Sequence, residues 1–228
     1  MSKLKKWLTV GLIIILTIGV SGCMSNKAIM LKHLEEKYGQ EFEIGRVGKE
    51  GFVFADGDYF TFACPKGGYW DTDSFRVQMD PKNKTSTGIK DGYFGILIRE
   101  DVEAEVLAAV SDLTFLAKAY YNPSTYYDNV FDRTKTYADF KQWGIDRGKP
   151  FLFTVAVCVS SDNLDESEKE DYAKQIFDKL QKDNYRGMVN VLFYPGEAFE
   201  QLTRANTNEL AKQYREQYTN ITKNINLK

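Results

Sequence analysis

Apolar residues in this chain occur first as one unbroken run and then at strand-like and helix-like intervals. Residues 7–20 carry no charge and are mostly apolar, a run of 14 residues. Further along, apolar residues recur every third or fourth position in some segments and every second position in others. The first spacing is typical of helices with one buried face, and the second is typical of strands.

The first half of the chain is predicted to contain one helix followed by strands. Met30 and Leu34 recur at helical spacing, and Ser25 and Gly39 supply start and stop signals, so we expect a helix over residues 26–38. Strand-like patterns cover residues 42–47, 52–54, 59–64, 75–79 and 93–98. Residues 80–92 are polar and predict a loop.

In the second half, predicted helices and strands alternate. Val102 and Val106 lie on the apolar face of a helix expected from residue 101 to about 120. Residues 151–159 are apolar on both faces, which indicates a central strand. The remaining expectations are a short strand over 126–131, a short helix over 136–142, a helix starting at Asp165 or Ser167, a strand over 188–194, a broken helix over 197–218 and a fraying tail after Asn220.

This order of elements predicts an α+β fold with a mixed or mainly antiparallel sheet and helices packed on one or both faces. The strand–helix–strand passage after residue 151 predicts a parallel crossover. One sheet in a single domain over residues 23–228 is the preferred arrangement. Two subdomains that part near residues 121–135 are the alternative.

The apolar run at the start has the layout of an export signal. Lys3, Lys5 and Lys6 precede it, and Val20-Ser21-Gly22-Cys23 follows it. This segment resembles a bacterial lipoprotein signal peptide, whose final cysteine is lipidated and becomes the mature N-terminus. The resemblance implies that residues 1–22 are removed and that acyl chains such as palmitate on Cys23 hold the protein on the extracytoplasmic face of the cell membrane. A retained transmembrane helix is the competing interpretation, but 14 apolar residues are few for a span.

Two short motifs extend the resemblance into the mature chain. Lys37-Tyr38-Gly39-Gln40-Glu41-Phe42 and Asp91-Gly92-Tyr93-Phe94-Gly95-Ile96 are similar to elements of small uncharacterised lipoproteins of low-GC Gram-positive bacteria. Those relatives imply no activity. The resemblance therefore carries over no functional residue except Cys23.

The net charge of the mature chain limits the classes of partner that it is expected to bind. Without residues 1–22, the chain has 27 basic and 32 acidic residues. This mild net negative charge excludes the basic footprint of a nucleic-acid-binding protein. It also predicts little attraction to anionic lipid headgroups, so the acyl chains would supply the anchoring.

Cysteine and histidine are too scarce for most catalytic or metal chemistry. Cys64 and Cys158 remain when Cys23 is lipidated, and they either form one disulfide or stay as two buried thiols. His33 is the single histidine and lies in the first predicted helix. We expect no metal site, no cofactor and no histidine-dependent catalytic group.

One loop combines aromatic and acidic side chains. Tyr69, Trp70, Asp71 and Asp73 follow a predicted strand, and rings beside carboxylates are the groups that sugar and peptide sites use. The preferred interpretation is nevertheless a plain hairpin connection whose Trp70 folds back on the sheet, and a binding site is the alternative. A second aromatic group, over residues 120–131, is interpreted mainly as the edge of the core, and the acids over 162–171 as the solvated start of a helix.

The sequence therefore predicts a tethered, non-enzymatic binding or accessory module with a protein, peptide or envelope glycan as partner. An envelope hydrolase that uses Asp71 and Asp73 is the first alternative. A short solute-binding lipoprotein of a transporter is the second.

Overall fold

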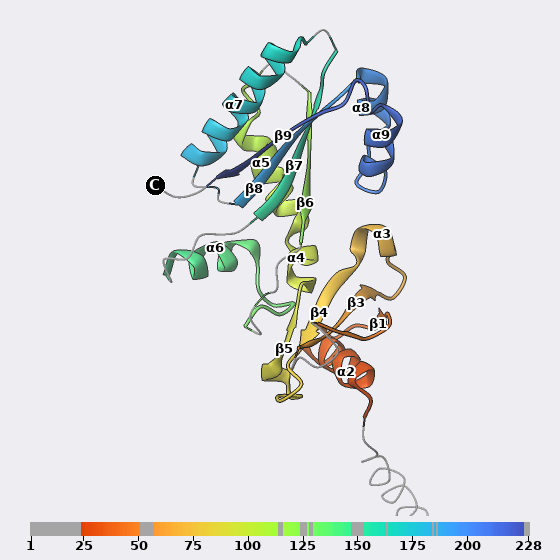
Figure 1. The fold of residues 1–228 in the computed structure, drawn as a ribbon. Coiled ribbons are helices and arrows are strands. Elements are labelled where there is room, and N and C mark those ends of the chain that lie inside the picture. The colour runs from red at the N-terminus through yellow and green to blue at the C-terminus, as the bar shows by residue number, and fades with distance from the viewer. Residues whose placement is uncertain are drawn as a thin grey trace, which may run out of the picture.

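The computed structural model describes most of the chain that follows Cys23. It covers residues 24–50, 57–113, 116–123, 127, 130–146, 153–162, 164–183, 185 and 187–225. The predicted leader, Cys23 and the strand predicted over residues 52–54 lie outside the described residues. The described part forms two lobes, each built around its own sheet (Figure 1). The predicted α+β class is confirmed.

The first lobe is one helix on an antiparallel sheet. Its elements are helix α2 (Asn26–Tyr38), strands β1 (Phe42–Ile44), β2 (Gly48–Lys49), β3 (Tyr59–Pro65), β4 (Phe75–Met79) and β5 (Ile89–Asp91), and the short helices α3 (Trp70–Asp73) and η1 (Ser86–Gly88). The strand order is β1-β3-β4-β5, and β2 also pairs with β3. One face of the sheet packs on α2, and the other carries α3 at its edge.

Local signals fix the ends of α2. The Ser25 hydroxyl accepts a hydrogen bond from the Ala28 backbone N–H, and Gly39 ends the helix with φ 65°. This left-handed conformation strains residues other than glycine. The helix predicted over residues 26–38 is confirmed.

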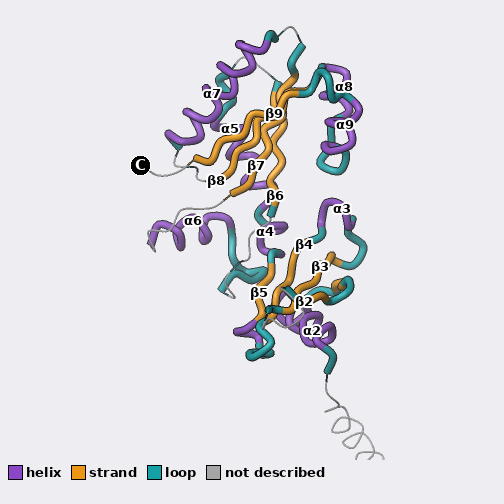
Figure 2. The backbone as a smooth tube through the Cα atoms, in the orientation of Figure 1, coloured by secondary structure: helices purple, strands orange, loops and turns teal. Residues whose placement is uncertain are grey.

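The second lobe is a mixed sheet with helices on both faces. Strands β6 (Ala117–Asn122), β7 (Phe153–Ser160), β8 (Gly187–Tyr194) and β9 (Thr219–Ile225) lie in that order. Strands β7 and β8 are parallel and joined by α7 (Glu166–Lys182), which confirms the predicted crossover and central strand. Helices α5 (Arg99–Ala109) and α7 cover one face, and α8 (Gly196–Gln201) and α9 (Thr207–Gln213) cover part of the other (Figure 2).

An apolar region joins the lobes along one side. Helix α4 (Tyr93–Leu97) lies between them, with Tyr93 in the core of the first lobe and Phe94 in the core of the second. The Phe94 ring lies 4.8 Å from that of Phe131 and 5.8 Å from that of Phe140 in α6 (Tyr137–Asp146), measured between centroids. The lobes are therefore packed together on the α4–α6 side.

Four predicted elements differ from the structure. Residues 80–92 are not all loop, because Ile89–Asp91 form β5 and pair with β4. Residues 93–98 are not a strand, because α4 is buried toward both lobes and so lacks the one-sided stripe that marks a helix. The helix predicted to reach residue 120 ends at Ala109, and β6 follows. The tail after Asn220 does not fray but forms β9, whose Ile221 and Ile225 pack on the core while its other side chains stay polar.

The single preferred sheet is also wrong, since the structure has two. The chain passes from the first sheet to the second between Asp91 and Ala117, ahead of the 121–135 boundary considered as the alternative. Cys64 and Cys158 are free, buried thiols on β3 and β7. The two strands belong to different sheets, which corrects the disulfide considered from the sequence.

Candidate functional site

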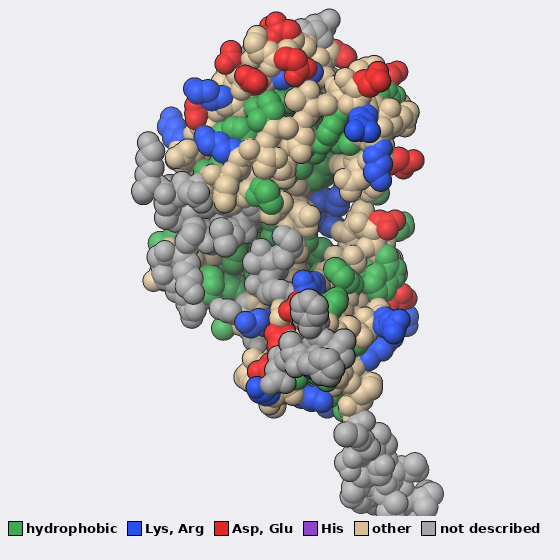
Figure 3. Space-filling model, viewed as in Figure 1, with side chains coloured by type: hydrophobic (Ala, Val, Ile, Leu, Met, Phe, Trp, Pro, Cys, Tyr) green, Lys and Arg blue, Asp and Glu red, His purple; other side chains and the backbone are tan. Residues whose placement is uncertain are grey.

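A cleft between the two lobes is the candidate site. It has a volume of about 540 Å³ and lies between α3 and β3 on one side and the second sheet with α9 on the other. Its lining is formed by Phe62, Asp71, Thr72, Ser74, Tyr120, Tyr121, Asn122, Pro123, Thr154, Ala156, Asn190, Leu192, Tyr194, Arg204, Thr207, Asn208, Tyr218 and Asn220. Figure 3 shows the hollow at the right of the molecule, with Lys and Arg atoms at its floor.

The wall from the second sheet is polar because helices cover only part of that face. Alternate residues of each strand point away from α5 and α7, and α8 and α9 bury those at one end of the sheet. At the uncovered end, Asn190 lies in register with Ala156 of β7 and Thr222 of β9. The Thr222 hydroxyl donates to Asn190 Oδ1 at 2.8 Å, which leaves the NH₂ group of that amide as a donor toward the cleft.

The opposite wall comes from the outer face of the first sheet. The Phe62 side chain on β3 is 50% exposed, which is unusual for an aromatic residue inside a strand. Asp71 and Thr72 of α3 extend this wall. An exposed ring thus faces amide and hydroxyl groups across the cleft.

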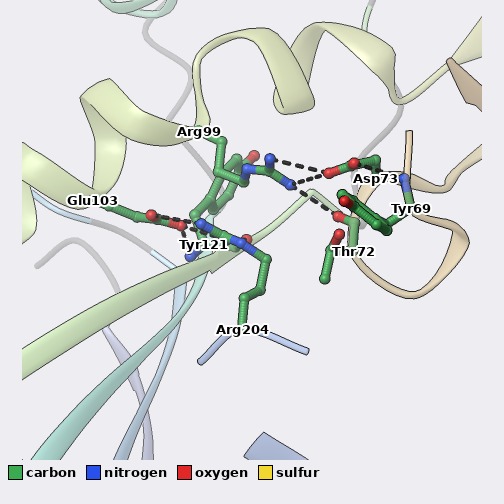
Figure 4. A network of polar contacts seen from close by, with 7 residues as sticks. All are labelled: Tyr69, Thr72, Asp73, Arg99, Glu103, Tyr121 and Arg204. Atoms are coloured by element: carbon green, nitrogen blue, oxygen red, sulfur yellow. Dashed lines mark hydrogen bonds and ion pairs between the residues drawn. The ribbon is translucent and has the colours of Figure 1, made fainter. Parts of the chain in front are cut away.

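Arg204 forms part of the cleft, but its charge is neutralised. Its guanidinium makes two hydrogen bonds to the Glu103 carboxylate, at 2.6 and 2.8 Å (Figure 4). It also lies 5.4 Å from the centre of the Tyr120 ring. The Tyr120 hydroxyl donates to the Leu202 carbonyl at 3.1 Å. Burial raises the pKa of Tyr120 to about 12, so this hydroxyl is protonated at physiological pH.

Helix α5 holds both edges of the cleft through two arginine contacts. Arg99 donates to the Thr72 carbonyl at 2.8 Å and to Asp73 Oδ1 at 3.1 Å, which fixes α3 (Figure 4). One turn further along α5, Glu103 binds Arg204 in the segment between α8 and α9. The width of the cleft therefore depends on side chains that share one face of a single helix.

Of the four loop residues selected from the sequence, the structure brings only Asp71 into the cleft. Asp73 faces Arg99; burial alone would raise its pKa, but hydrogen bonds from the Tyr69 backbone N–H and Arg99 outweigh this and hold the pKa below its usual range. Trp70 Nε1 donates to Glu43 Oε2 at 3.3 Å, and Tyr69 is 77% exposed outside the lining. Asp73 therefore positions the loop, and the other two lie at its outer edge.

The second aromatic group divides between core and cleft. Tyr121, Tyr127 and Phe131 are buried, whereas Tyr120 faces the cleft. The acids near residue 165 begin α7, where the Asp165 carboxylate accepts from the Glu168 backbone N–H at 2.9 Å. Both predictions of an ordinary structural role are consistent with these contacts.

Sequence reasoning missed Phe62, Asn190 and Arg204. The available signal was polar Asn and Thr at outward positions of otherwise apolar strands, such as Thr154 and Asn190. That signal gains meaning only when the strand order is known, since the residues that meet across the sheet are more than 30 positions apart.

The described residues contain neither a metal-binding cluster nor a membrane-spanning helix. No group of three or more His, Cys, Asp or Glu residues there is arranged to hold a metal ion. Among those residues, too, no helix combines the length and apolar character that crossing a bilayer requires.

Comparison with known proteins does not identify a family for this chain. No family model matches the chain, and no curated protein matches it. Among solved structures, a DUF5037 family protein from Ruminococcus gnavus ATCC 29149 is similar with 12% identity and a TM-score of 0.48, over 88% of this chain and 92% of that one. A similarity of this size does not identify a function.

Proposed function

We propose that this protein is a lipid-anchored, extracytoplasmic and non-enzymatic binding protein that holds a neutral, hydroxyl-rich glycan in the cleft between its lobes. The observation that carries the proposal is the lining of the cleft. It combines an exposed ring, several amide and hydroxyl side chains, and an arginine that is already paired.

The chemistry of the lining suits a sugar. A side-chain amide offers an acceptor and two donors, which match neighbouring hydroxyl groups of a sugar ring. Phe62 supplies an apolar surface on which the ring face can pack. A volume of about 540 Å³ lies within the range of small-ligand sites. Among the described residues, Asp71 is the only carboxylate in the lining and Arg204 is already paired, so no free positive charge there favours a strongly anionic ligand.

This lining supports binding over hydrolysis. Glycoside hydrolysis generally uses two carboxyl groups, one as acid and one as base or nucleophile. Asp73 is occupied by Arg99 and does not line the cleft, which leaves Asp71 alone. The two-lobed form also suits the solute-binding alternative, which differs from our proposal in taking one small sugar rather than a longer glycan.

A ligand screen on the purified chain tests the cleft. We expect neutral oligosaccharides, including N-acetylglucosamine oligomers, to raise the melting temperature, because a ligand that binds only the native state stabilises it. Phe62→Ala and Asn190→Ala should each weaken the binding by about tenfold or more, measured by titration calorimetry.

Two substitutions outside the cleft serve as matched controls. Ile145→Ala removes an exposed apolar side chain from α6, and Gln175→Ala removes an exposed amide from α7. Both should bind as the parent does. A melting-temperature increase with uncharged peptides but not with sugars would assign the cleft to peptides and refute the glycan.

The anchor is tested separately in cells. Cys23→Ala should abolish incorporation of radioactive palmitate, because the acyl chains would be bonded to that sulfur. Equal labelling of parent and variant, or no labelling of the parent, would contradict the anchor without bearing on the cleft.

A further inference from the structure

A second concave surface lies at the end of the first lobe where the chain enters from Cys23. It has a volume of about 630 Å³ and is formed by the start of α2, the turn between β1 and β2, and Tyr59 of β3. The start of α2 and helix α3 lie at opposite ends of this lobe (Figure 1), and the cleft is lined by residues of α3 and by none of this surface. The two surfaces are therefore separate.

Three cations line this surface without a compensating acid. Lys27, Arg46 and Lys49 are all exposed, no Asp or Glu belongs to the lining, and none of the three is paired with an acid elsewhere in the described chain. A fourth cation is close, since Lys84 Nζ lies 5.8 Å from the centre of the Tyr59 ring.

Two described acids that adjoin the lining in the sequence are engaged elsewhere. Glu50, which follows Lys49, forms an ion pair with Arg76. Asp58, which precedes Tyr59, accepts a hydrogen bond from Gln78 at 2.5 Å. Both partners lie on β4, so among the described residues this surface keeps a local positive charge although the whole chain is mildly acidic.

The position of these cations along the chain is as informative as their charge. Lys27 is only four residues from Cys23, a separation of about 14 Å when fully extended and less once α2 begins. An acylated cysteine lies at the membrane surface. The attraction of cations to an anionic leaflet acts within about 8 Å at physiological salt, and this surface is the part of the lobe that the tether brings there.

We propose that Lys27, Arg46 and Lys49 form a contact surface for the headgroups of anionic phospholipids, which seats the first lobe on the membrane. The inference relies on the proposed anchor only for the location of the surface. It revises the expectation, drawn from net charge, that headgroups contribute little. The seated lobe would hold the cleft away from the bilayer.

Vesicle binding by the mature chain from Cys23, without acyl groups, measures the affinity of this surface for lipid without the contribution of the anchor. We expect binding to vesicles of phosphatidylglycerol and phosphatidylcholine, much weaker binding to pure phosphatidylcholine, and loss of binding in 0.5 M salt. Each neutralised cation should reduce the binding by about fivefold, so the triple variant Lys27→Ala, Arg46→Ala and Lys49→Ala should lose about 100-fold.

A matched triple variant on the second lobe gives the control. Lys174→Ala, Lys182→Ala and Lys212→Ala remove the same charge from exposed positions and should change the binding by less than about threefold. Equal losses in both triple variants would overturn the proposal, because net charge alone would then explain the binding. Melting temperatures should match the parent in both, since all six side chains are exposed.

Competition with soluble glycerol phosphate distinguishes binding to a membrane surface from binding to a free phosphate. At millimolar concentration it should leave vesicle binding unchanged, because several headgroups contact the surface at once. Displacement would refute the membrane as the partner. Palmitate labelling of the parent chain is independent of these results, so failure of the anchor and failure of this surface are distinguishable.

Discussion

At the scale of single residues, the buried carboxylate of Asp91 depends on several polar partners for its stability. Its side chain is fully buried and accepts hydrogen bonds from Lys37 Nζ at 2.8 Å, the Tyr38 hydroxyl at 2.7 Å and the Tyr93 backbone N–H at 3.0 Å. His33 Nε2 lies 3.8 Å away. A buried carboxylate is tolerated only when it is paired and hydrogen-bonded. These contacts hold α2 against β5 and α4.

Removing the charge of Asp91 should therefore destabilise the fold strongly. We expect Asp91→Asn to lower the free energy of unfolding by about 3–5 kcal/mol, because the buried Lys37 ammonium loses its partner. Urea unfolding measures this change. Adding Lys37→Met should restore part of the loss, whereas Asp171→Asn, on the exposed face of α7, should change little. A minor effect of Asp91→Asn would show that Lys37 is not held as a buried cation.

The same carboxylates predict how stability depends on pH. Burial acts to raise the pKa of Asp91, but the contacts with His33 and Lys37 outweigh it, so its pKa lies below the usual value, as does that of Asp73. The unfolded chain then takes up protons first on acidification. We expect stability to be fully present above about pH 5 and to fall below about pH 4.

Urea midpoints between pH 7 and pH 2 test this expectation. The decline should be shallower in Asp91→Asn, which lacks one of the groups responsible. A midpoint that rises on acidification would reverse the sign and contradict the assignment.

At the scale of helices and strands, α7 shows how local signals set a boundary. Asp165 Oδ1 accepts from the Glu168 backbone N–H, and the Glu168 carboxylate accepts from the Asp165 backbone N–H at 2.9 Å. This reciprocal pair satisfies two donors that the helix itself cannot. Ile176 and Leu180 then follow at helical spacing and are buried against the second sheet.

Loss of this cap should have a small and specific effect. Asp165→Ala should lower the melting temperature by about 2–4 °C, since the helix start loses an acceptor. Asp165→Asn keeps a side-chain acceptor and should remain close to the parent. If both substitutions lowered the melting temperature equally, the charge rather than the cap would be responsible. Thermal unfolding followed by circular dichroism gives the comparison.

The elements predicted correctly are those whose evidence is local. Helices α2 and α7 carry a cap and a stripe within their own residues, and β7 and β8 are mostly apolar. Helix α4 and strand β9 were wrong because their patterns depend on neighbours: α4 is enclosed by two lobes, and β9 is an edge strand with few buried residues. The sequence within either segment contains no pattern that indicates these surroundings.

The candidate site divides in the same way. Asp71 was found because aromatic and acidic residues adjoin it in the sequence. Asn190 was not found because its role arises from strand register, which places it beside Ala156 and Thr222. Phe62 was not found because an aromatic residue within a strand is ordinarily buried, whereas in the structure it is half exposed and lines the cleft.

At the scale of the whole molecule, the two lobes are joined differently on their two sides. On the α4–α6 side, aromatic rings pack together and the Tyr127 backbone N–H donates to the Asp91 carbonyl at 2.9 Å. On the cleft side, the edges are held by the ion pairs of Arg99 and Glu103 on α5. Apolar packing thus fixes the lobes, and polar contacts set the edges of the cleft.

If α5 holds the two edges separately, each can be released without the other. Arg99→Met should free α3 and speed amide hydrogen exchange over residues 69–74, because Asp73 and the Thr72 carbonyl lose their donor. Arg204→Met should instead speed exchange between α8 and α9 and leave α3 protected, since Glu103 and the Tyr121 carbonyl lose a donor while the contacts of Arg99 with α3 remain. Both variants should bind the ligand more weakly, because Asp71 and Thr72 are misplaced in the first and Tyr120 in the second.

Hydrogen exchange measured on the two variants side by side tests whether the edges are independent. Release of both edges by either substitution would mean that the edges form one cooperative unit. Protected amides in β7 and β8 would confirm that the second sheet itself is intact.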